Sequence, residues 1–212
     1  MKQKKSELPR KPRVPRHATP LANEIRIIGG QWKRTKLAVA DRPGLRPTPD
    51  RVRETLFNWL GQDLTGWRCV DVFAGTGVLG FEAASRGAKE VQLVELDTAL
   101  VAQLKRTQIQ LKANATQVVR GDGVVTLKQM DPGSMDVIFI DPPFDSTLFE
   151  PALAAAGRVV APDGFIYLEA PLLWSDEKLK DMGLTVHRHL KAGAVHAHIL
   201  KKVASLPVTA SL

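Results

Sequence analysis

Two short segments of this chain contain residue types at a spacing that could do chemistry. Residues 71–80 (DVFAGTGVLG) join an apolar run to a glycine-rich loop and the start of a helix. Residues 141–144 (DPPF) follow a second apolar run about half a domain later. The first segment could hold a nucleoside-bearing cofactor. The second could present acceptor oxygens and an aromatic ring to a planar amine.

The glycine-rich loop predicts a ligand site at the N-terminus of a helix. Gly75, Gly77 and Gly80 match the pattern GxGxxG, which by itself is a weak signal. Glycines let the chain turn sharply and bring backbone N–H groups close to a ligand at the helix start. Asp71 precedes them, and a carboxylate there repels a pyrophosphate but can pair with the ammonium group of a methionine moiety. The loop therefore favours S-adenosylmethionine over a dinucleotide.

Acidic residues also follow the next two predicted strands. Glu95 ends one strand at the position where nucleotide-binding α/β folds place a carboxylate on the ribose hydroxyls. Asp122 follows the next strand and either accepts from an adenine amino group or caps a helix, whereas Asp97 is expected mainly as a cap. These carboxylates share the ligand-binding edge of an open α/β sheet. The residues expected to contact the cofactor are Asp71, Phe73, Ala74, Gly75, Thr76, Gly77, Glu95, Leu96, Asp122, Gly123 and Asp141.

The loop 141–144 predicts the reaction centre. The exocyclic amine of a nucleic-acid base is a poor nucleophile, because its lone pair is delocalised into the ring. The Asp141 carboxylate and the Pro142 carbonyl could accept its hydrogens and hold it in line with a sulfonium methyl group. Pro143 stiffens the loop further, and Phe144 can stack on the base. Catalysis of this kind depends on positioning and electrostatics rather than on covalent chemistry.

The positive charge of the chain is concentrated near its N-terminus. The 212 residues carry a formal charge of +8. Residues 1–53 hold 15 Lys/Arg and 4 Asp/Glu, an excess of +11, whereas residues 54–212 carry −3. This distribution is typical of an appendage that meets a polyanion, so we expect RNA phosphates to bind there. The residues expected to contact RNA are Arg26, Lys33, Arg34, Arg51 and Arg53.

The composition is that of a globular protein, with 44% hydrophobic and 25% charged residues. Cys69 is the single cysteine, so an intrachain disulfide is excluded and a reducing cytoplasm is the expected compartment. No apolar stretch approaches the ~20 residues that span a bilayer. No apolar segment follows the basic start, so a secretory signal is not expected either.

Strand and helix patterns alternate from Trp67 onward. Strands are predicted at 68–73, 90–95, 117–120, 135–140 and 164–169, and helices at 78–85, 98–111, 123–129 and 147–160. This alternation predicts a Rossmann-like, mostly parallel sheet with helices on both faces. Strands at 184–190 and 195–202, turned at Gly193, are expected to end it as an antiparallel hairpin.

The N-terminal part is expected to add a small extension. Residues 1–22, rich in proline and basic side chains, are expected to form a disordered arm. Residues 23–47 should contain a β-hairpin, with strands at 24–28 and 32–40 turned at Gly29 and Gly30. The catalytic domain should span 48–203, and 204–212 should be a tail. Thr48 is expected to cap its first helix, with Pro49 at the first helical position.

The two motifs together resemble class I S-adenosylmethionine-dependent methyltransferases that act on amino nitrogens. More narrowly, residues 26–30 (RIIGG), 46–48 (RPT), 50–57 (DRVRETLF) and 71–80 resemble the RsmD family. The resemblance covers about residues 24–203. It implies a seven-stranded sheet, methylation of guanine N2 in 16S ribosomal RNA, and a partly assembled small ribosomal subunit as substrate. A monomer is expected.

Other functions remain open from the sequence. Enzymes that methylate adenine N6 in nucleic acid or glutamine in proteins use related loops and the same cofactor. A dehydrogenase is disfavoured by Asp71 and by the proline loop. Binding of labelled S-adenosylmethionine would exclude both a dehydrogenase and a non-catalytic nucleic-acid-binding module. Four histidines alternate on the two last predicted strands, which is also what one face of a hairpin looks like, so no metal is expected. They are His187, His189, His196 and His198.

Overall fold

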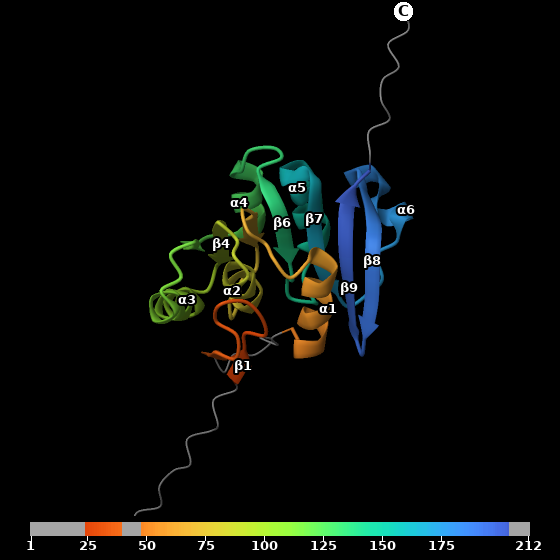
Figure 1. The fold of residues 1–212 in the computed structure, drawn as a ribbon. Helices are drawn as coiled ribbons and strands as arrows, with labels where there is room; N and C mark the ends of the chain where they lie inside the picture. Colours follow the sequence, from red (N-terminus) through yellow and green to blue (C-terminus); the bar gives the residue numbers. More distant parts are fainter. Residues whose placement is uncertain (1–23, 40–47, 204–212) are drawn as a thin grey trace, which may run out of the picture.

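The computed structural model describes residues 24–39 and 48–203, so the expected arm and tail lie outside the described residues. Its centre is a seven-stranded sheet in the order β5-β4-β3-β6-β7-β9-β8 (Figure 1). The five strands from β5 to β7 are parallel, and β9 and β8 are antiparallel to their neighbours. The strands are β3 (Arg68–Asp71), β4 (Glu90–Glu95), β5 (Thr116–Arg120), β6 (Met135–Ile140), β7 (Val160–Ala170), β8 (Leu184–Ala192) and β9 (Val195–Lys202). The predicted fold is confirmed.

Helices cover both faces of this sheet. One face carries α1 (Asp50–Leu60), α2 (Val78–Ser85) and α3 (Thr98–Leu111). The other carries α4 (Gly123–Gln129), α5 (Phe149–Val159), and the short α6 (Asp176–Leu179), which a 3-10 turn η1 (Lys180–Met182) extends. The described residues contain no helix with the length and apolar character needed to cross a membrane.

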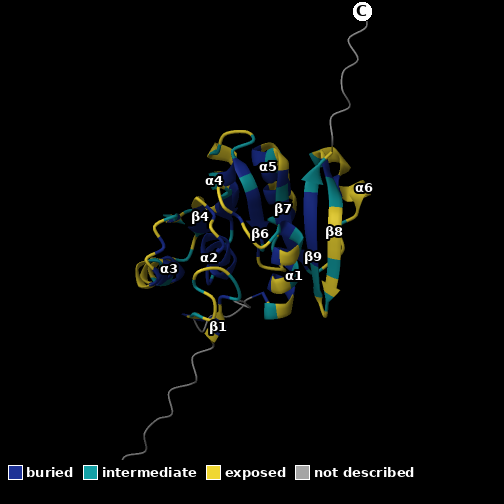
Figure 2. Cartoon of the chain, in the orientation of Figure 1, coloured by how far each residue is buried: buried dark blue, intermediate teal, exposed yellow. Residues whose placement is uncertain are grey.

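The two faces have separate apolar cores because side chains alternate along each strand. Cys69, Phe139 and Tyr167 belong to the core under α1, whereas Val70 and Ile138 belong to the core under α5. Figure 2 shows that the central strands are largely buried and that exposed residues gather on the edge strand β8. Every second residue along a strand, counted from Cys69, Phe139 or Tyr167, therefore lies on the α1 face.

The N-terminal hairpin is shorter than predicted and is docked on α2. Its strands are only β1 (Glu24–Arg26) and β2 (Lys36–Ala38). Ile28 and Gly29 lie outside β1, and their N–H groups donate to the Glu82 carboxylate at 2.8 and 2.7 Å. The Ser85 hydroxyl donates to the Gly29 carbonyl at 2.6 Å. Contact with α2 thus replaces the strand pairing that the sequence pattern predicted.

The start of α1 differs from the prediction. Pro49 is the residue before the helix and Asp50 is its first residue, with no side-chain cap. Thr48 is buried, and its hydroxyl bonds carboxyl groups at the edge of the main sheet instead of the helix N-terminus. The expected N-cap was wrong because a nearby pair of acidic groups competes for the same hydroxyl.

Arg53 is fully buried, which corrects its expected role as an RNA contact. Its guanidinium donates to the carbonyls of Thr48 (3.1 Å) and Arg26 (2.9 Å) and to the Asp50 carboxylate (2.6 Å). It also lies 3.5 Å from the Glu82 carboxylate on α2. A side chain with no exposed surface cannot reach a phosphate, so Arg53 is a structural residue.

We expect Arg53→Ala to lower the free energy of unfolding by about 3–5 kcal/mol, since removing one partner leaves a buried charge and several buried acceptors unmatched. Urea denaturation measures the loss. Arg51→Ala, on the exposed side of the same helix, is the matched control and should change stability by no more than about 0.5 kcal/mol. Equal losses in the two variants would contradict the structural role.

Candidate active site

Four carboxyl groups meet at the edge of the sheet where the parallel strands end. Asp71 is the last residue of β3, Glu95 is the last of β4, and Asp141 follows β6 directly. Glu169 is the penultimate residue of β7. Because Asp71, Asp141 and Glu169 lie two residues after Cys69, Phe139 and Tyr167, they lie on the α1 face. Ligands of open α/β sheets bind at this edge.

The glycine-rich loop connects β3 to α2 and is tied to the neighbouring strand. Gly75 and Gly77 have φ angles of 50° and 77°, in the left-handed region, and Gly77 directly precedes α2. The Gly75 N–H donates to the Glu95 carboxylate at 2.8 Å. The other oxygen of Glu95 accepts from the Asp97 N–H, also at 2.8 Å. Glu95 therefore fixes the glycine-rich loop in place. The ribose contact expected of Glu95 stays a prediction.

Asp71 is a carboxyl group buried at the end of β3. It is 2% exposed and accepts a hydrogen bond from the Gly80 N–H at 3.1 Å. No Lys or Arg among the described residues forms an ion pair with it. Burial, with a smaller contribution from the Glu95 charge, raises the pKa of Asp71 to about 7. A cationic ligand group would supply the missing charge.

The acidic residues after β4 and β5 both cap helices. Asp97 accepts from the N–H groups of Ala99 (2.7 Å) and Leu100 (3.0 Å) at the start of α3. Asp122 accepts from the Val125 N–H at 2.9 Å at the start of α4. Both caps were among the interpretations that the sequence left open. The adenine contact of Asp122 stays a prediction.

The remaining expected cofactor residues lie around these two strand ends. A side chain at Gly123 would place its Cβ 2.3 Å from the Val72 carbonyl oxygen, so α4 can approach β3 only with glycine there. Leu96 is 65% exposed beside the loop. Thr76 is buried, and its hydroxyl accepts weakly from the Val78 N–H at 3.4 Å. Phe73 and Ala74 complete the turn between β3 and the glycines.

Asp141 lies beside Glu169 on the neighbouring strand. β6 and β7 pair in parallel register, Phe139 with Tyr167 and Ile140 with Leu168, so the next residues of the two strands are Asp141 and Glu169. The Tyr167 hydroxyl donates to Glu169 at 2.9 Å. The Thr48 hydroxyl is hydrogen-bonded to both carboxyl groups. These contacts bring Thr48, which lies just before α1, to the two carboxyl groups.

The two carboxyl groups share one electrostatic environment. Burial, the Glu169 charge and the Asp71 charge all raise the pKa of Asp141 well above its ordinary value. Burial also raises the pKa of Glu169, although the bonds from Thr48 and Tyr167 oppose the shift. Two close carboxyl groups cannot both ionise easily, so the pair tends to retain one proton.

The loop after Asp141 presents its aromatic side chain to solvent. Pro142 is buried, Pro143 is exposed, and the Pro143 carbonyl accepts from the Ser146 N–H at 3.0 Å. Phe144 is 40% exposed. A large apolar ring exposed at a ligand-binding edge is available to stack on a planar base.

The sequence patterns did not predict that Thr48, Tyr167 or Glu169 belongs to this site. Thr48 was expected only as a helix cap. Glu169 was placed at the end of a predicted strand without a function. An acidic residue in an otherwise apolar, fully buried strand (IYLEA, 166–170) is a signal that could have been used, because a buried charge needs a reason.

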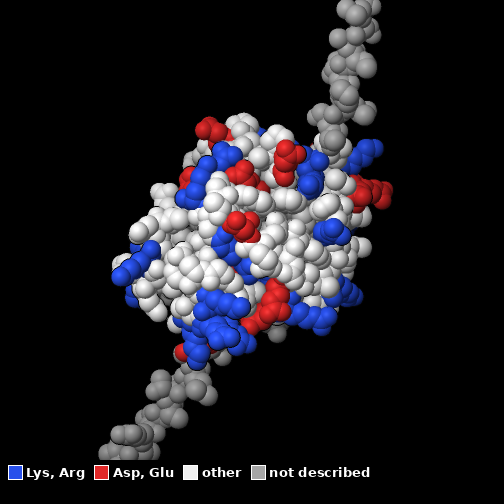
Figure 3. Space-filling model, viewed as in Figure 1, with Lys and Arg blue, Asp and Glu red and all other residues white. Residues whose placement is uncertain are grey.

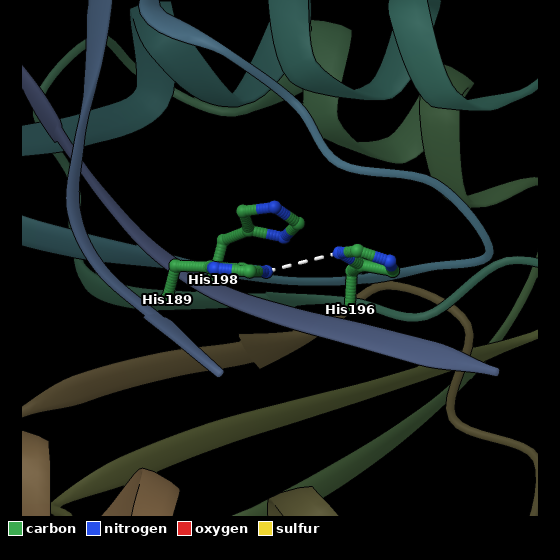
Figure 4. A group of neighbouring side chains, drawn as sticks. All are labelled: His189, His196 and His198. Atoms are coloured by element: carbon green, nitrogen blue, oxygen red, sulfur yellow. Dashed lines mark hydrogen bonds between the residues drawn. The ribbon is translucent and has the colours of Figure 1, made fainter. Parts of the chain in front are cut away.

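His189, His196 and His198 gather on the α5 face of the sheet, opposite the α1 face that carries the carboxyl groups. Figure 4 shows these three side chains. Their possible metal-ligand atoms lie within 4.8 Å of one another. His189 Nε2 and His196 Nδ1 are 3.0 Å apart and share a hydrogen bond. His198 Nε2 accepts from the Trp174 N–H at 3.2 Å, and its Nδ1 faces the Leu168 carbonyl at 3.4 Å. Both nitrogens of the buried His198 are engaged, so the absence of a metal stays our prediction.

We expect Asp71→Asn to stabilise the ligand-free protein at pH 8. With a pKa of about 7 when folded and 3.8 ordinarily, Asp71 costs stability progressively as pH rises from about 4 to 7. Asparagine cannot ionise, and its side-chain oxygen can still accept from Gly80. Urea denaturation at pH 8 should show a gain of up to about 4 kcal/mol, which vanishes near pH 4. A variant less stable than wild type at pH 8 would contradict the buried, unpaired charge.

Comparisons with known proteins agree on one family. The family model described as "Conserved hypothetical protein 95" matches residues 25–201. Ribosomal RNA small subunit methyltransferase D of Escherichia coli is 41% identical over 178 residues, covering 79% of this chain and 89% of that protein. The protein of the same name from Haemophilus influenzae is 42% identical, and the match covers 78% of this chain and 92% of that protein.

Solved structures give the same result. The Escherichia coli protein yhhF superposes with a TM-score of 0.73 at 35% sequence identity, covering 86% of this chain and all of that one. A precorrin-6y methyltransferase from Geobacter metallireducens, at 19% identity and a TM-score of 0.62, shares the fold. The chain belongs to the Conserved hypothetical protein 95 family, which is the RsmD family of ribosomal RNA small subunit methyltransferases.

Proposed function

We propose that this protein transfers a methyl group from S-adenosylmethionine to the exocyclic N2 of a guanine in 16S ribosomal RNA. The observation that carries the proposal is the position of Asp141, directly after β6 and beside the buried Asp71 at the same sheet edge. The names of the relatives support a small-subunit ribosomal RNA substrate. The RsmD-like motifs support guanine N2.

The residues around Asp71 fit S-adenosylmethionine. No Lys or Arg of the described ranges pairs with the buried Asp71 carboxylate, and the ammonium group of the methionine moiety would supply a positive charge there. Gly75 and Gly77 leave room for backbone to approach the ligand. Glu95 would hold the ribose hydroxyls, and Leu96 and Asp122 would lie along the adenine. When bound, this cofactor supplies an electrophilic methyl group on a sulfonium.

The loop 141–144 would prepare the amine for attack. Asp141 and the Pro142 carbonyl accept the N2 hydrogens, while Phe144 stacks on the base and holds it in place. S-adenosylmethionine bound beside Asp71 would supply a methyl group to the N2 lone pair held by these residues. After transfer N2 would carry one proton too many, and the Asp141 carboxylate would accept it. Pro143 keeps the loop rigid during transfer.

The N-terminal hairpin would bind the RNA backbone. Lys and Arg side chains gather over this part of the molecule in Figure 3. Lys33, Arg34 and Arg51 are exposed, whereas the exposed Arg26 also pairs with Asp50 at 3.0 Å. Phosphate contacts position a nucleic acid without reading its sequence, which leaves base choice to the pocket. We infer that the protein works as a monomer in the cytoplasm on an assembling small subunit.

We expect Asp141→Ala to lower the rate of methyl transfer by ~10²–10³, by analogy with the loss of one oxyanion-hole donor. The assay is the formation of N2-methylguanosine, detected by mass spectrometry, in small-subunit particles from cells that lack the gene. Asp145→Ala, an exposed carboxylate in the same loop, is the matched control and should keep the wild-type rate. N6-methyladenosine or methylglutamine as the product would overturn the proposed substrate.

Neutralising Arg34 or Arg51 should weaken RNA binding and flatten its salt dependence. Each lost phosphate contact removes about 0.7–0.9 from the slope of log K against log salt concentration, because fewer counterions are released. Filter binding between 50 and 300 mM salt is the measurement, roughly the range over which such slopes are resolved. Lys128→Gln, on α4 across the sheet, is the control with an unchanged slope. If both arginine variants behaved as wild type while deletion of residues 1–22 abolished binding, the docking surface would be that segment and not the hairpin.

A further inference from the structure

The reaction centre contains a second carboxyl group that the proposed chemistry does not use. Glu169 lies beside Asp141 on the adjoining strand and on the same face of the sheet. It is 3% exposed, and no Lys or Arg of the described ranges forms an ion pair with it. A buried carboxyl group without a cation costs stability. Its position one strand from Asp141 points to a role with the substrate.

The surroundings of Glu169 hold the group in a fixed direction. The Tyr167 hydroxyl donates to Oε2 at 2.9 Å, and the ring of Tyr167 packs edge-on against Phe139 with centroids 6.4 Å apart. The Thr48 hydroxyl joins Glu169 to Asp141. A hydroxyl can donate to one carboxylate and accept from the other when that one is protonated. A protonated carboxyl group keeps an oxygen that can accept, so the pair still offers one acceptor from each residue, side by side.

Two adjacent acceptors match guanine better than the other amino substrates. The Watson–Crick edge of guanine presents two neighbouring donors, N1–H and the N2 amine. In adenine the amine is next to N1, which is an acceptor, and in glutamine the amide nitrogen is next to a carbonyl oxygen. Each of these would place an acceptor against the second carboxylate, which is unfavourable in a buried site.

We propose that Glu169 accepts the N1–H of the target guanine while Asp141 accepts a hydrogen of N2, so that Glu169 selects guanine. Tyr167 donates to Glu169 Oε2 and Thr48 also bonds this carboxyl group, so Glu169 accepts from the base through its remaining lone pairs. The bond from N1–H also favours the ionised carboxylate and offsets part of its burial. Tyr167 and Thr48 act through Glu169 as positioning residues. This inference rests on the proposed guanine-N2 activity.

The test compares guanine with 2-aminopurine at the target position of small-subunit particles reconstituted from ligated RNA. 2-Aminopurine keeps the 2-amino group, but its N1 is an acceptor with no hydrogen. Wild-type enzyme should prefer guanine by ~10² or more in kcat/KM, because sites built to bind a donor reject analogues that lack it. Glu169→Gln can donate an amide N–H to N1 of 2-aminopurine. Its preference for guanine should fall to about tenfold or less, with a higher absolute rate on 2-aminopurine.

Glu150→Gln is the matched control, since Glu150 is an exposed carboxylate at the start of α5, and should keep the wild-type preference. Tyr167→Phe removes the bond to Oε2 without adding a donor, so its preference should decline without an increased rate on 2-aminopurine. Cofactor affinity, measured by calorimetry, should remain within a few-fold of wild type in both Glu169→Gln and Tyr167→Phe.

Equal preference ratios in wild type, Glu169→Gln and Tyr167→Phe would overturn the role of Glu169. If Glu169→Gln fails to bind cofactor and is misfolded, the ratio measured for Tyr167→Phe decides. Failure of the proposed function looks different, because wild-type enzyme would then form no N2-methylguanosine on the unmodified particle. The two failures are therefore distinguishable in one set of reactions.

Discussion

The arrangement of the candidate active site depends on the contacts of one buried carboxylate, that of Glu82. It accepts from the backbone of the hairpin at Ile28 and Gly29 and pairs with Arg86 at 2.9 Å on its own helix. It also lies 3.5 Å from Arg53 on α1. One charged group thus joins the hairpin, α1 and α2, the helix that begins at the glycine-rich loop. Satisfying so many buried donors makes the group costly to disturb.

The same network reaches the reaction centre through Arg53. The Arg53 guanidinium donates to the carbonyl of Thr48, and the Thr48 hydroxyl bonds Asp141 and Glu169. Thr48 and residues 50–57, which the sequence resemblance singled out, therefore have a physical explanation. Thr48 supplies the hydroxyl that bonds Asp141 and Glu169, and Arg53 holds the Thr48 carbonyl.

The sequence predicted the elements of the catalytic domain well because their ends carry local signals. α3 and α4 begin directly after Asp97 and Asp122, whose side chains cap them. The cap was the expected role of Asp97 and one of the two interpretations left open for Asp122. The glycine-rich loop fixes the start of α2 in the same way, at Gly77. Strand β7 is longer than predicted and begins at Val160, because its first residues pair with β6 across an irregular register.

Contacts between distant residues were beyond sequence patterns. Arg53 falls among polar neighbours on α1, so helical periodicity placed it on the surface, yet its partner Glu82 is buried 29 residues away. Glu169 gains meaning only when β7 lies beside β6. The short α6 was missed because four residues carry too little periodic pattern. Pairings that depend on the tertiary fold need the structure.

Gly29 packs too closely against the end of α2 to carry a side chain, which limits how this family can be engineered or can diverge. A Cβ there would lie 2.2 Å from the Arg86 guanidinium, and a Cβ at Gly30 would lie 1.9 Å from the Ser85 carbonyl oxygen. The hairpin is therefore not a transplantable module: a hairpin exchanged from another protein would require a matching surface on the host's α2. Changes in the hairpin and in α2 must be made together, as a coordinated pair of substitutions rather than one at a time.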